Sequence, residues 1–263
     1  MLYLYIMRLN KFLASAGIAS RRKCDEIISE GQIYVNGKQA DELGTQIDEN
    51  NDIVEYKGKT VKLAGEFVYY KLNKPEGYIC SAKDDRNRKT VYELINLPDI
   101  RVFTVGRLDY NTQGLLLLTN NGEMAQALIH PSFELEKEYH CTIKGDIKSG
   151  EISKLSKGVM FENEKLPEAK IAVIKKELDE NANVLKTKLS IKIYQGLNRQ
   201  IRKMFMAINK KIVLLKRVAI AEIKLGNLKT GEFKPLTKEE LNIINKYYDI
   251  FKTKQNKRSW IYV

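Results

Sequence analysis

One aspartate stands where a carboxylate could take part in a reaction. Asp109 follows Arg107 by two residues, between two apolar stretches, Arg101–Val105 and Leu115–Thr119, that read as strands. A carboxylate can act as a nucleophile or as a base. Away from water it stays ionised only beside a cation, because burial alone raises its pKa. The spacing makes Asp109 a candidate, although a turn aspartate beside a surface arginine explains the same pattern more simply.

The elements that would position this loop follow a mixed pattern of strands and helices. Apolar stretches predict strands at residues 67–72, 101–105, 115–119, 138–144, 168–175, 184–194, 212–216 and 219–225. Helical spacing predicts helices at 90–95, 123–129, 150–157 and 199–208, and Thr237–Glu240 has the form of a capping box that opens a last helix. The expected fold class is α+β with a mixed, largely antiparallel sheet.

A smaller unit precedes these elements. Apolar residues within Leu9–Ala16 recur at the spacing of one helix face, and Gly17 ends that helix. Ser20 is placed to cap a second helix that runs to about Glu30. Asn36-Gly37 between apolar residues predicts a hairpin, and further short strands follow.

A short linker at residues 63–66 sets the expected domain boundaries. They give an N-terminal domain at 7–64, a larger domain at 67–248 and a basic C-terminal tail at 249–263. Residues 1–6 lack the basic start and the cleavage signature of a signal peptide. They are expected to be an extension or a disordered tail.

The net charge indicates a polyanionic partner. The chain carries 45 Lys and Arg against 33 Asp and Glu, a net charge of +12, and nucleic acid is the commonest partner of such a surface. Composition alone fits a solvated basic surface without a partner equally well. The N-terminal unit is nevertheless polarised, because its first basic residues all precede its first acid, Asp25. They are Arg8, Lys11, Arg21, Arg22 and Lys23.

Two segments of the N-terminal unit, Leu9–Arg22 and Gly31–Gly37, resemble a known RNA-binding domain. They are similar to the S4 RNA-binding domain (αL-type). The resemblance implies that the five basic residues contact RNA phosphates. A helix N-terminus suits that role, since its free N–H groups and its dipole favour anions.

Several segments of the larger unit resemble the RsuA/RluB family of pseudouridine synthases, in the order expected for that family. They are Asn73–Tyr78, Gly106–Asp109 with Asn111–Asn120, His130–Ser132, Lys137–Tyr139, Asn198–Met204, Leu215–Arg217 and Leu225–Glu232. The likeness spans residues 7–242 and implies that the chain isomerises one uridine of ribosomal RNA to pseudouridine. That reaction breaks the C1′–N1 glycosidic bond, rotates the uracil and rejoins it through C5. The product is an isomer, so no cofactor, metal or energy source is required.

The resemblance also implies a role for each matching residue. Asp109 corresponds to the catalytic carboxylate, Arg202 to the arginine that pairs with it, and Tyr139 to the aromatic residue that stacks on the target base. A guanidinium suits the pairing because it can bind a carboxylate through two hydrogen bonds. Arg107 is expected to support the loop or to contact RNA. The expected lining of the substrate groove comprises Asn198, Arg199 and Lys203.

Two positions depart from the family pattern, and one chemical question stays open. Many relatives have arginine where this chain has Leu197, so one phosphate contact is expected to be missing. Arg217–Glu222 differs from the more usual Arg-Val-x-Ile-Gly, which affects fine substrate geometry rather than activity. Asp109 could attack C1′, attack the uracil ring, or abstract the 2′ proton, and the sequence does not decide among these routes.

The identity of the RNA is read from the loop after Asp109. Tyr110–Thr119, followed by His130-Pro-Ser, is closer to enzymes of large-subunit 23S ribosomal RNA than to the small-subunit branch. The alternatives are a 16S ribosomal RNA enzyme and an S4-type RNA-binding protein without activity; free RNA and a partly assembled subunit both stay open as substrates. A glycosidase would need a second carboxylate beside the bond, and a nuclease would need metal-binding acids. Neither set stands out.

Cysteine and histidine usage argues against disulfides and zinc. Cys24, Cys80 and Cys141 are far apart, which fits a reducing cytosol, and two histidines are too few for a typical zinc site. No apolar run approaches the ~20 residues that span a membrane. The expectation is a cytoplasmic, bacterial, monomeric protein with ribosomal RNA as its partner and no metal.

Overall fold

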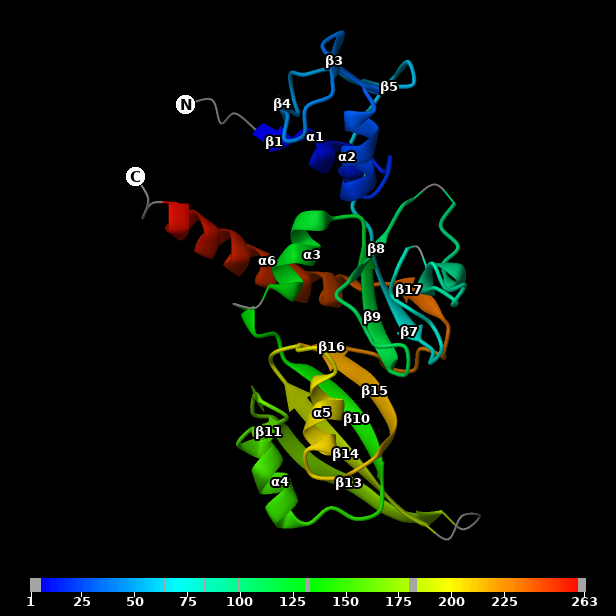
Figure 1. The fold of residues 1–263 in the computed structure, drawn as a ribbon, viewed down its shortest axis with the longest axis vertical. Helices are drawn as coiled ribbons and strands as arrows, with labels where there is room; N and C mark the ends of the chain where they lie inside the picture. Colours follow the sequence, from blue (N-terminus) through cyan, green and yellow to red (C-terminus); the bar gives the residue numbers. More distant parts are fainter. Residues whose placement is uncertain are drawn as a thin grey trace. The chain divides into compact units, whose positions relative to one another are not determined.

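The chain folds into two compact units (Figure 1). The computed structural model describes residues 6–63, 65–82, 84–98, 100–130, 133–179 and 184–259. One unit comprises the chain up to residue 68 with residues 97–102 and 120–122, and the other comprises the rest. Pro131 and Ser132, which end one of the matching segments, lie outside the described residues.

The first unit packs two helices with short strands. Its elements are β1 (Ile6–Arg8), α1 (Leu9–Ser15), α2 (Arg21–Ser29), β2 (Ile33–Val35), β3 (Lys38–Ala40), β4 (Gln46–Asp48), β5 (Val54–Tyr56) and β6 (Lys59–Thr60). Strands β3, β2, β5 and β6 form one antiparallel sheet in that order, and β1 pairs with β4. Apolar side chains of α1, α2, β2, β4 and β5 form one shared core. The expected order of two helices and a small sheet is therefore confirmed.

Local sequence explains where the second helix begins and where the hairpin turns. The Ser20 hydroxyl accepts a hydrogen bond from Lys23 N at 3.3 Å and so caps α2. Asn36 and Gly37 both have positive φ, +51° and +75°, as a two-residue hairpin turn of type I′ requires. The cap and the turn predicted at these residues are confirmed.

The second unit is built on a nine-stranded sheet. Its strands are β7 (Tyr69–Lys74), β8 (Phe103–Val105), β9 (Gln113–Thr119), β10 (Lys137–Lys144), β13 (Lys170–Asp179), β14 (Val184–Ile193), β15 (Ile212–Ile220), β16 (Ile223–Lys224) and β17 (Phe233–Pro235). The main path runs β13-β14-β10-β15-β9-β7-β17, with β8 beside β9 and β16 beside β15. Only the β15–β9 pair is parallel among the described strands, so the expected α+β class with a largely antiparallel sheet is confirmed.

Helices cover parts of this sheet. They are η1 (Val91–Leu94), α3 (Gly122–Ile129), α4 (Ser149–Ser156), α5 (Gln200–Met206) and α6 (Lys238–Ser259). In Figure 1, α4 and α5 lie in front of β10, β13 and β14, near the hairpin of β11 (Val159–Phe161) and β12 (Glu164–Leu166). Around β9, Leu115 and Leu117 share a core with Met124 and Leu128 of α3 and Ile244 of α6.

Strand β10 divides its side chains between two faces of the sheet. Tyr139, Cys141 and Ile143 are buried, whereas His140 and Thr142 between them are only half-buried. Successive side chains of a strand point to opposite faces. We call the face of Tyr139 the inner face and the face of His140 the outer face of β13, β14, β10 and β15.

Several elements differ from the sequence-based expectation. The strands expected at 212–216 and 219–225 form one continuous β15 followed by the short β16, and the β11–β12 hairpin was not expected. Ile6, expected in an extension, belongs to β1 and pairs with Asp48, whereas residues 1–5 lie outside the described residues. Strands this short are recognised by their backbone pairing with another segment, which the local sequence does not show.

The C-terminal tail expected at 249–263 is largely helical, because α6 continues to Ser259. Phe251 is buried and its ring lies 5.6 Å from that of Phe133. The Tyr248 hydroxyl donates to Glu123 Oε2 at 2.7 Å. These contacts anchor the helix beyond residue 248, and residues 260–263 lie outside the described residues.

Gly114 is predicted to tolerate no side chain, because β15 passes directly beside it. A Cβ at Gly114 would lie 2.1 Å from the Arg217 backbone oxygen, and its φ is +105°. Gly114→Ala is therefore expected to lower the free energy of unfolding by about 3 kcal/mol, measured by urea titration. Gly150→Ala in α4 is the control, since no other group lies within 4 Å of that position. A Gly114 variant as stable as the wild type would contradict the close approach of the two strands.

Candidate active site

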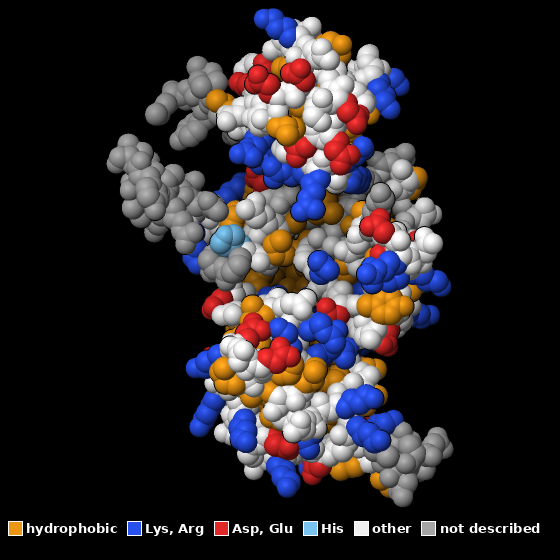
Figure 2. Space-filling model, viewed as in Figure 1, with side chains coloured by type: hydrophobic (Ala, Val, Ile, Leu, Met, Phe, Trp, Pro, Cys, Tyr) orange, Lys and Arg blue, Asp and Glu red, His pale blue; other side chains and the backbone are white. Residues whose placement is uncertain are grey.

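A cavity of about 820 Å³ opens between the loop before β9 and the inner face of the sheet. It is lined by segments of the β8–β9 loop, the start of β10, the segment from the end of β14 into α5, and β15. In Figure 2 this surface is hollowed, with hydrophobic side chains inside it and Lys and Arg side chains around it. A cavity of this size accommodates a small organic ligand.

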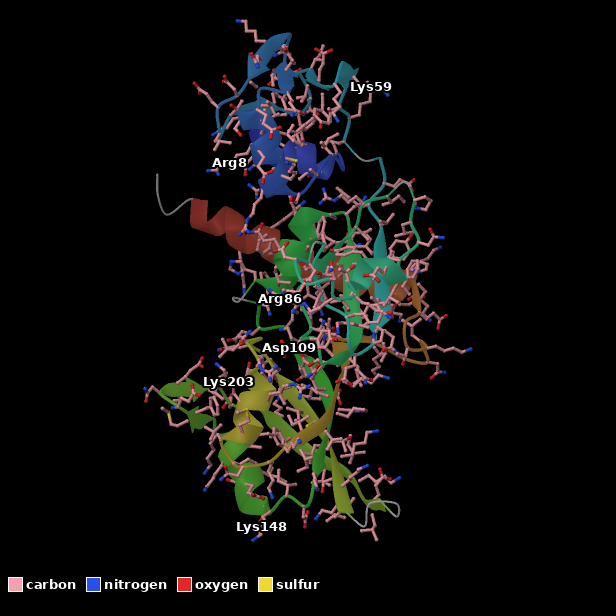
Figure 3. All side chains as sticks on the ribbon, turned by 45° about the vertical axis from the view of Figure 1, so that its right-hand side comes forward. Arg8, Lys59, Arg86, Asp109, Lys148 and Lys203 are labelled. Carbon is pink, nitrogen blue, oxygen red and sulfur yellow. The ribbon has the colours of Figure 1, made fainter. Side chains whose placement is uncertain are left out.

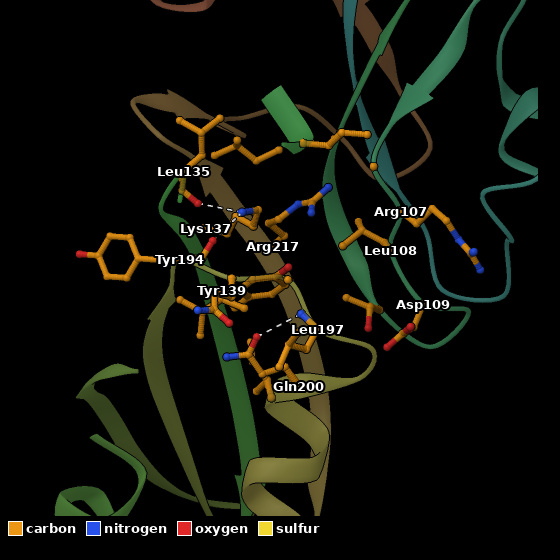
Figure 4. Close-up of a pocket in the computed structure, with 18 of the residues that line it drawn as sticks. Arg107, Leu108, Asp109, Leu135, Lys137, Tyr139, Tyr194, Leu197, Gln200 and Arg217 are labelled. Atoms are coloured by element: carbon orange, nitrogen blue, oxygen red, sulfur yellow. Dashed lines mark hydrogen bonds between the residues drawn. The ribbon is translucent and has the colours of Figure 1, made fainter. Parts of the chain in front are cut away.

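Asp109 lies in the loop between β8 and β9 and is half-buried at the cavity. The loop is turned by a hydrogen bond from Thr112 N to Asp109 O at 3.0 Å, and Gly77 N donates to Tyr110 O at 2.9 Å. Figure 4 shows the Asp109 side chain on the loop side of the cavity and the Tyr139 ring on the sheet side. The fold thus brings together two of the residues that the sequence singled out.

Lys74 binds the backbone of this loop. Its side chain is fully buried at the end of β7, and its Nζ donates to the backbone oxygens of Pro75 at 3.0 Å, Asp109 at 3.1 Å and Thr112 at 2.9 Å. Burial lowers the pKa of Lys74 to about 8, and the charge of Asp109 is among the weaker effects that raise it. Sequence reasoning missed this residue; its signal was a lysine next to the apolar strand Tyr69–Leu72.

Alkaline pH is expected to stabilise the wild type relative to a Lys74→Met variant. The pKa of Lys74 falls from 10.5 to about 8 on folding, so between these values the unfolded chain binds more protons than the folded protein. The free energy of unfolding of the wild type should then rise with pH above about 8, whereas methionine does not titrate. Urea titrations of both proteins from about pH 7 to 10 measure the difference between their free energies of unfolding, which we call the gap. A constant gap would mean that Lys74 keeps its ordinary pKa.

Arg202 reaches the same loop, but it does not pair with the carboxylate as expected. Its Nη2 donates to the backbone oxygen of Asn111 at 2.5 Å, and the described residues include no ion pair between Arg202 and Asp109. Burial lowers the pKa of Arg202 and Arg199 lowers it further, while Asp109 acts in the opposite direction. The guanidinium therefore binds the backbone of the loop, and the charge of the Asp109 carboxylate raises its pKa.

Tyr139 forms part of the sheet side of the cavity. It is 8% exposed and lies opposite Arg217 of β15 in the strand register. Arg217 Nε donates to Leu115 O at 2.8 Å, and Lys137 Nζ donates to the backbone oxygens of Leu135 and Tyr194 at 2.8 and 3.0 Å. Burial, with the charge of Arg217 second, lowers the pKa of Lys137 to about 8. Two cations thus stand close together beside the ring (Figure 4).

Several buried polar atoms at the cavity have no protein partner. Within the described residues, five buried side-chain atoms lack a hydrogen bond, and four of them belong to residues that line the cavity. These four are Thr112 Oγ1, Gln200 Nε2, Arg202 Nε and Arg217 Nη2. Buried polar atoms are normally paired, so these four residues leave hydrogen-bonding capacity unused next to the cavity.

The remaining expected groove residues are placed less uniformly. Asn198 and Arg199 are exposed and line the cavity, and so does Arg107, whose side chain points away from the Tyr139 ring (Figure 4). Lys203 does not line the cavity: its Nζ lies 2.8 Å from Glu164 Oε2 on β12. Figure 3 labels Lys203 and Asp109 for comparison.

The basic residues expected to contact RNA lie at the end of β1, in α1 and in α2 of the first unit. Arg8, Arg21, Arg22 and Lys23 are exposed and Lys11 is half-buried. Lys23 Nζ lies 2.7 Å from Glu26 Oε2, so its charge is partly balanced. Arg8, Arg21 and Arg22 lie around the start of the two helices, where an anion is favoured.

Neither a metal cluster nor a membrane span is found in the part of the chain that the structure describes. No group of three or more His, Cys, Asp or Glu side chains there could hold a metal ion. No described helix combines the length and the hydropathy needed to cross a membrane.

Comparisons with known proteins agree with this arrangement. The RNA pseudouridylate synthase family matches residues 68–207, and the S4 domain matches residues 7–53. The chain is 40% identical over 235 residues to ribosomal large subunit pseudouridine synthase B of Bacillus subtilis, which covers 89% of this chain and 93% of the relative. It is 39% identical over 236 residues to an uncharacterised RNA pseudouridine synthase of Aquifex aeolicus, with 89% and 92% covered.

A solved structure supports the same conclusion. A crystal structure of a pseudouridylate synthase matches 90% of this chain and 99% of its own, with a TM-score of 0.63 and 27% identity. Sequence and fold thus agree over most of both units. The chain belongs to the RNA pseudouridylate synthase family, as an enzyme that carries an S4 domain ahead of its synthase domain.

Proposed function

We propose that this enzyme converts one uridine of large-subunit ribosomal RNA to pseudouridine, with the carboxylate of Asp109 as its catalytic group. One observation carries the proposal: Asp109, Tyr139 and four residues that each have an unpartnered buried polar atom line the same cavity. The Bacillus subtilis relative is named for the large ribosomal subunit, which supports 23S over 16S ribosomal RNA as the substrate.

Uracil matches the polar groups of this cavity. It presents two carbonyl oxygens, and Gln200 Nε2, Arg202 Nε and Arg217 Nη2 are donors that lack acceptors. Cytosine presents an amino donor at the position where uracil has its second carbonyl oxygen. The target base must leave its stack to enter the cavity, and stacking on Tyr139 recovers roughly 1–3 kcal/mol of that cost.

Asp109 performs the step that detaches the base. Its carboxylate acts as a nucleophile on C1′ or on the uracil ring, or as a base on the 2′ proton, and each route requires the ionised form. The C1′–N1 bond breaks, the uracil turns, and the C1′–C5 bond forms. C5 then loses its hydrogen as a proton while N1 gains one, so the atoms balance without a cofactor.

Two cationic side chains position this carboxylate without neutralising it directly. Lys74 binds the backbone oxygens of Asp109 and Thr112, and Arg202 binds that of Asn111. Their charges stabilise the ionised carboxylate in a partly dry site. Because they hold the main chain, the Asp109 oxygens stay free for the substrate.

The S4 domain supplies phosphate-directed affinity in this proposal. Arg8, Arg21 and Arg22 are exposed there, and their contacts with phosphates would release counterions. RNA binding should therefore weaken steeply with salt. The alternative function is RNA binding without catalysis.

Tritium release from C5-labelled uridine tests the proposed function. Transcribed 23S and 16S ribosomal RNA, labelled at C5 of uridine, are each incubated with the purified full-length protein. The C5 hydrogen is lost only if the base is rejoined through carbon. Release from 23S RNA alone is the expected result. Release from 16S RNA alone would overturn the choice of subunit, and no release from either RNA or from immature subunits would favour the non-catalytic alternative.

A further inference from the structure

We propose that the outer face of β13, β14, β10 and β15 is a second RNA-binding surface, which grips phosphates of the substrate outside the uridine cavity. The proposal rests on the proposed function only in taking RNA as the substrate. The cavity opens on the inner face with Tyr139, so this surface lies on the opposite side of the same strands. No residue of the proposed active site belongs to it.

The strand register places lysines directly opposite one another on this face. Three cross-strand pairs consist of two lysines each, namely Lys144–Lys186, Lys175–Lys188 and Lys170–Lys192. Like charges directly opposite in a sheet are destabilising. Each pair places two like charges on neighbouring strands, and an anionic partner would lower the repulsion that carboxylates of the protein leave uncompensated.

The end of the face near the loop before β10 balances part of its charge within the protein. Lys192 Nζ lies 2.8 Å from Glu136 Oε1, and Lys170 Nζ donates to the Tyr194 hydroxyl at 2.7 Å. On the edge strand, Lys175 pairs with Glu177 at 2.7 Å. These lysines are therefore poor candidates for strong phosphate contacts.

Three other lysines of the face keep their charge unbalanced. Lys144, Lys188 and Lys216 form no ion pair with any carboxylate of the described residues. Lys216 lies directly across from His140, and Lys188 lies across from the neighbouring Thr142. Lys188 and Lys216, on the two strands beside β10, thus lie near His140, and Lys144 lies four residues further along the same face of β10.

The pKa of His140 depends on these neighbouring charges. Burial lowers its pKa, Lys188 lowers it further, and Lys216 also lowers it, while Glu138 raises it. A phosphate bound between the lysines would oppose the lowering effects and raise the pKa of His140. Since the chain has only two histidines, this change can be followed at a single residue.

The chemistry of the face favours an RNA backbone over bases or an acidic protein. Strands about 4.8 Å apart, with residues two apart spaced roughly 7 Å along each, give a grid of flexible ammonium groups. The outward-facing positions of the four strands carry no Phe, Tyr or Trp in the described residues, so they offer no ring for base stacking. Such a surface binds phosphates without reading sequence.

The first test compares two triple variants of the full-length protein for binding to transcribed 23S ribosomal RNA over a range of salt. One replaces Lys144, Lys188 and Lys216 with glutamine; the matched control replaces the exposed Lys229, Lys234 and Lys238 with glutamine. The slope of log affinity against log salt should become shallower by about 2–3 in the first variant and by less than about 1 in the control. Equal slopes for both variants would overturn the proposal.

The second test follows His140 by NMR in the wild type, with His140→Gln for assignment. A short RNA duplex of unrelated sequence should raise the pKa of His140. Polyglutamate is the acidic-protein probe. A shift with polyglutamate but not with RNA would overturn the proposal in favour of an acidic protein partner.

Thermal stability separates this role from a structural one. Replacing Lys188 removes one of the opposed lysine pairs, so Lys188→Gln should raise the melting temperature while RNA binding weakens. If Lys188 merely supported the fold, its replacement would lower the melting temperature. If the wild type released no tritium but the salt slope of the lysine variant and the pKa of His140 changed as expected, only the proposed function would be refuted. If release were normal but the salt slope and the pKa of His140 stayed unchanged, only this inference would be refuted.

Discussion

Asp109→Asn is expected to lower pseudouridine formation roughly 10⁴-fold or more, while RNA affinity stays within about twofold of the wild type. Asparagine keeps the size of the side chain but removes the negative charge that every proposed route requires. The loop should keep its shape, because Lys74 and Arg202 bind its backbone rather than the carboxylate. Tritium release measures turnover, and filter binding to the same RNA measures affinity.

Asp146→Asn is the matched control for this variant. Asp146 is an exposed aspartate that pairs with Lys176 at 2.6 Å, at the end of β10 that lies away from the cavity. Its substitution should change neither turnover nor binding. If Asp109→Asn retained a tenth of the activity, or lost affinity and turnover in parallel, Asp109 would not be the catalytic group.

Lys74→Met is expected to lower turnover about 100-fold and the free energy of unfolding by about 2–3 kcal/mol. Methionine fills a similar volume but donates no hydrogen bond, so the backbone oxygens of Pro75, Asp109 and Thr112 lose their shared donor. Relief of the buried charge offsets part of the loss. The loop would then hold Asp109 less accurately, and a small displacement at a reacting group is costly.

Lys71→Met separates positioning from stability. Lys71 is another buried lysine of β7, and it binds Glu240 and the backbone oxygen of Lys224 instead of the loop. Its loss should also destabilise the protein but leave turnover within about threefold of the wild type under conditions where both variants are folded. Equal losses of turnover in the two variants would mean that Lys74 acts through stability alone.

Much of the fold could be predicted from local sequence. The Ser20 cap and the Asn36-Gly37 turn depend on residues close in the chain, and the structure contains both. The boundaries of β15 and α6 could not be predicted in the same way. Strand β15 continues through residues without strong alternation because β10 pairs along its length, and α6 is held by contacts of Phe251 and Tyr248 with distant segments.

The site divides in the same manner. The resemblance of short motifs brought Asp109, Tyr139 and Arg202 into consideration, and the fold places all three at one cavity. It did not reveal that Arg202 binds the Asn111 backbone oxygen, nor that Lys74 supports the loop. Both depend on which backbone atoms come within reach of a long side chain, and sequence spacing carries no such information.

The alternation of side chains along β10 has a consequence for how the protein can vary. Odd-numbered positions such as Tyr139, which lines the cavity, point to the inner face, and even-numbered ones such as His140 point to the outer face. Insertion of one residue in this strand would exchange the two sets, so the ring and the lysine-bordered histidine would trade places. Substitution at every second position does not disturb the other set. Uridine chemistry and the proposed RNA grip can therefore be altered separately within a single strand, provided that its length is kept.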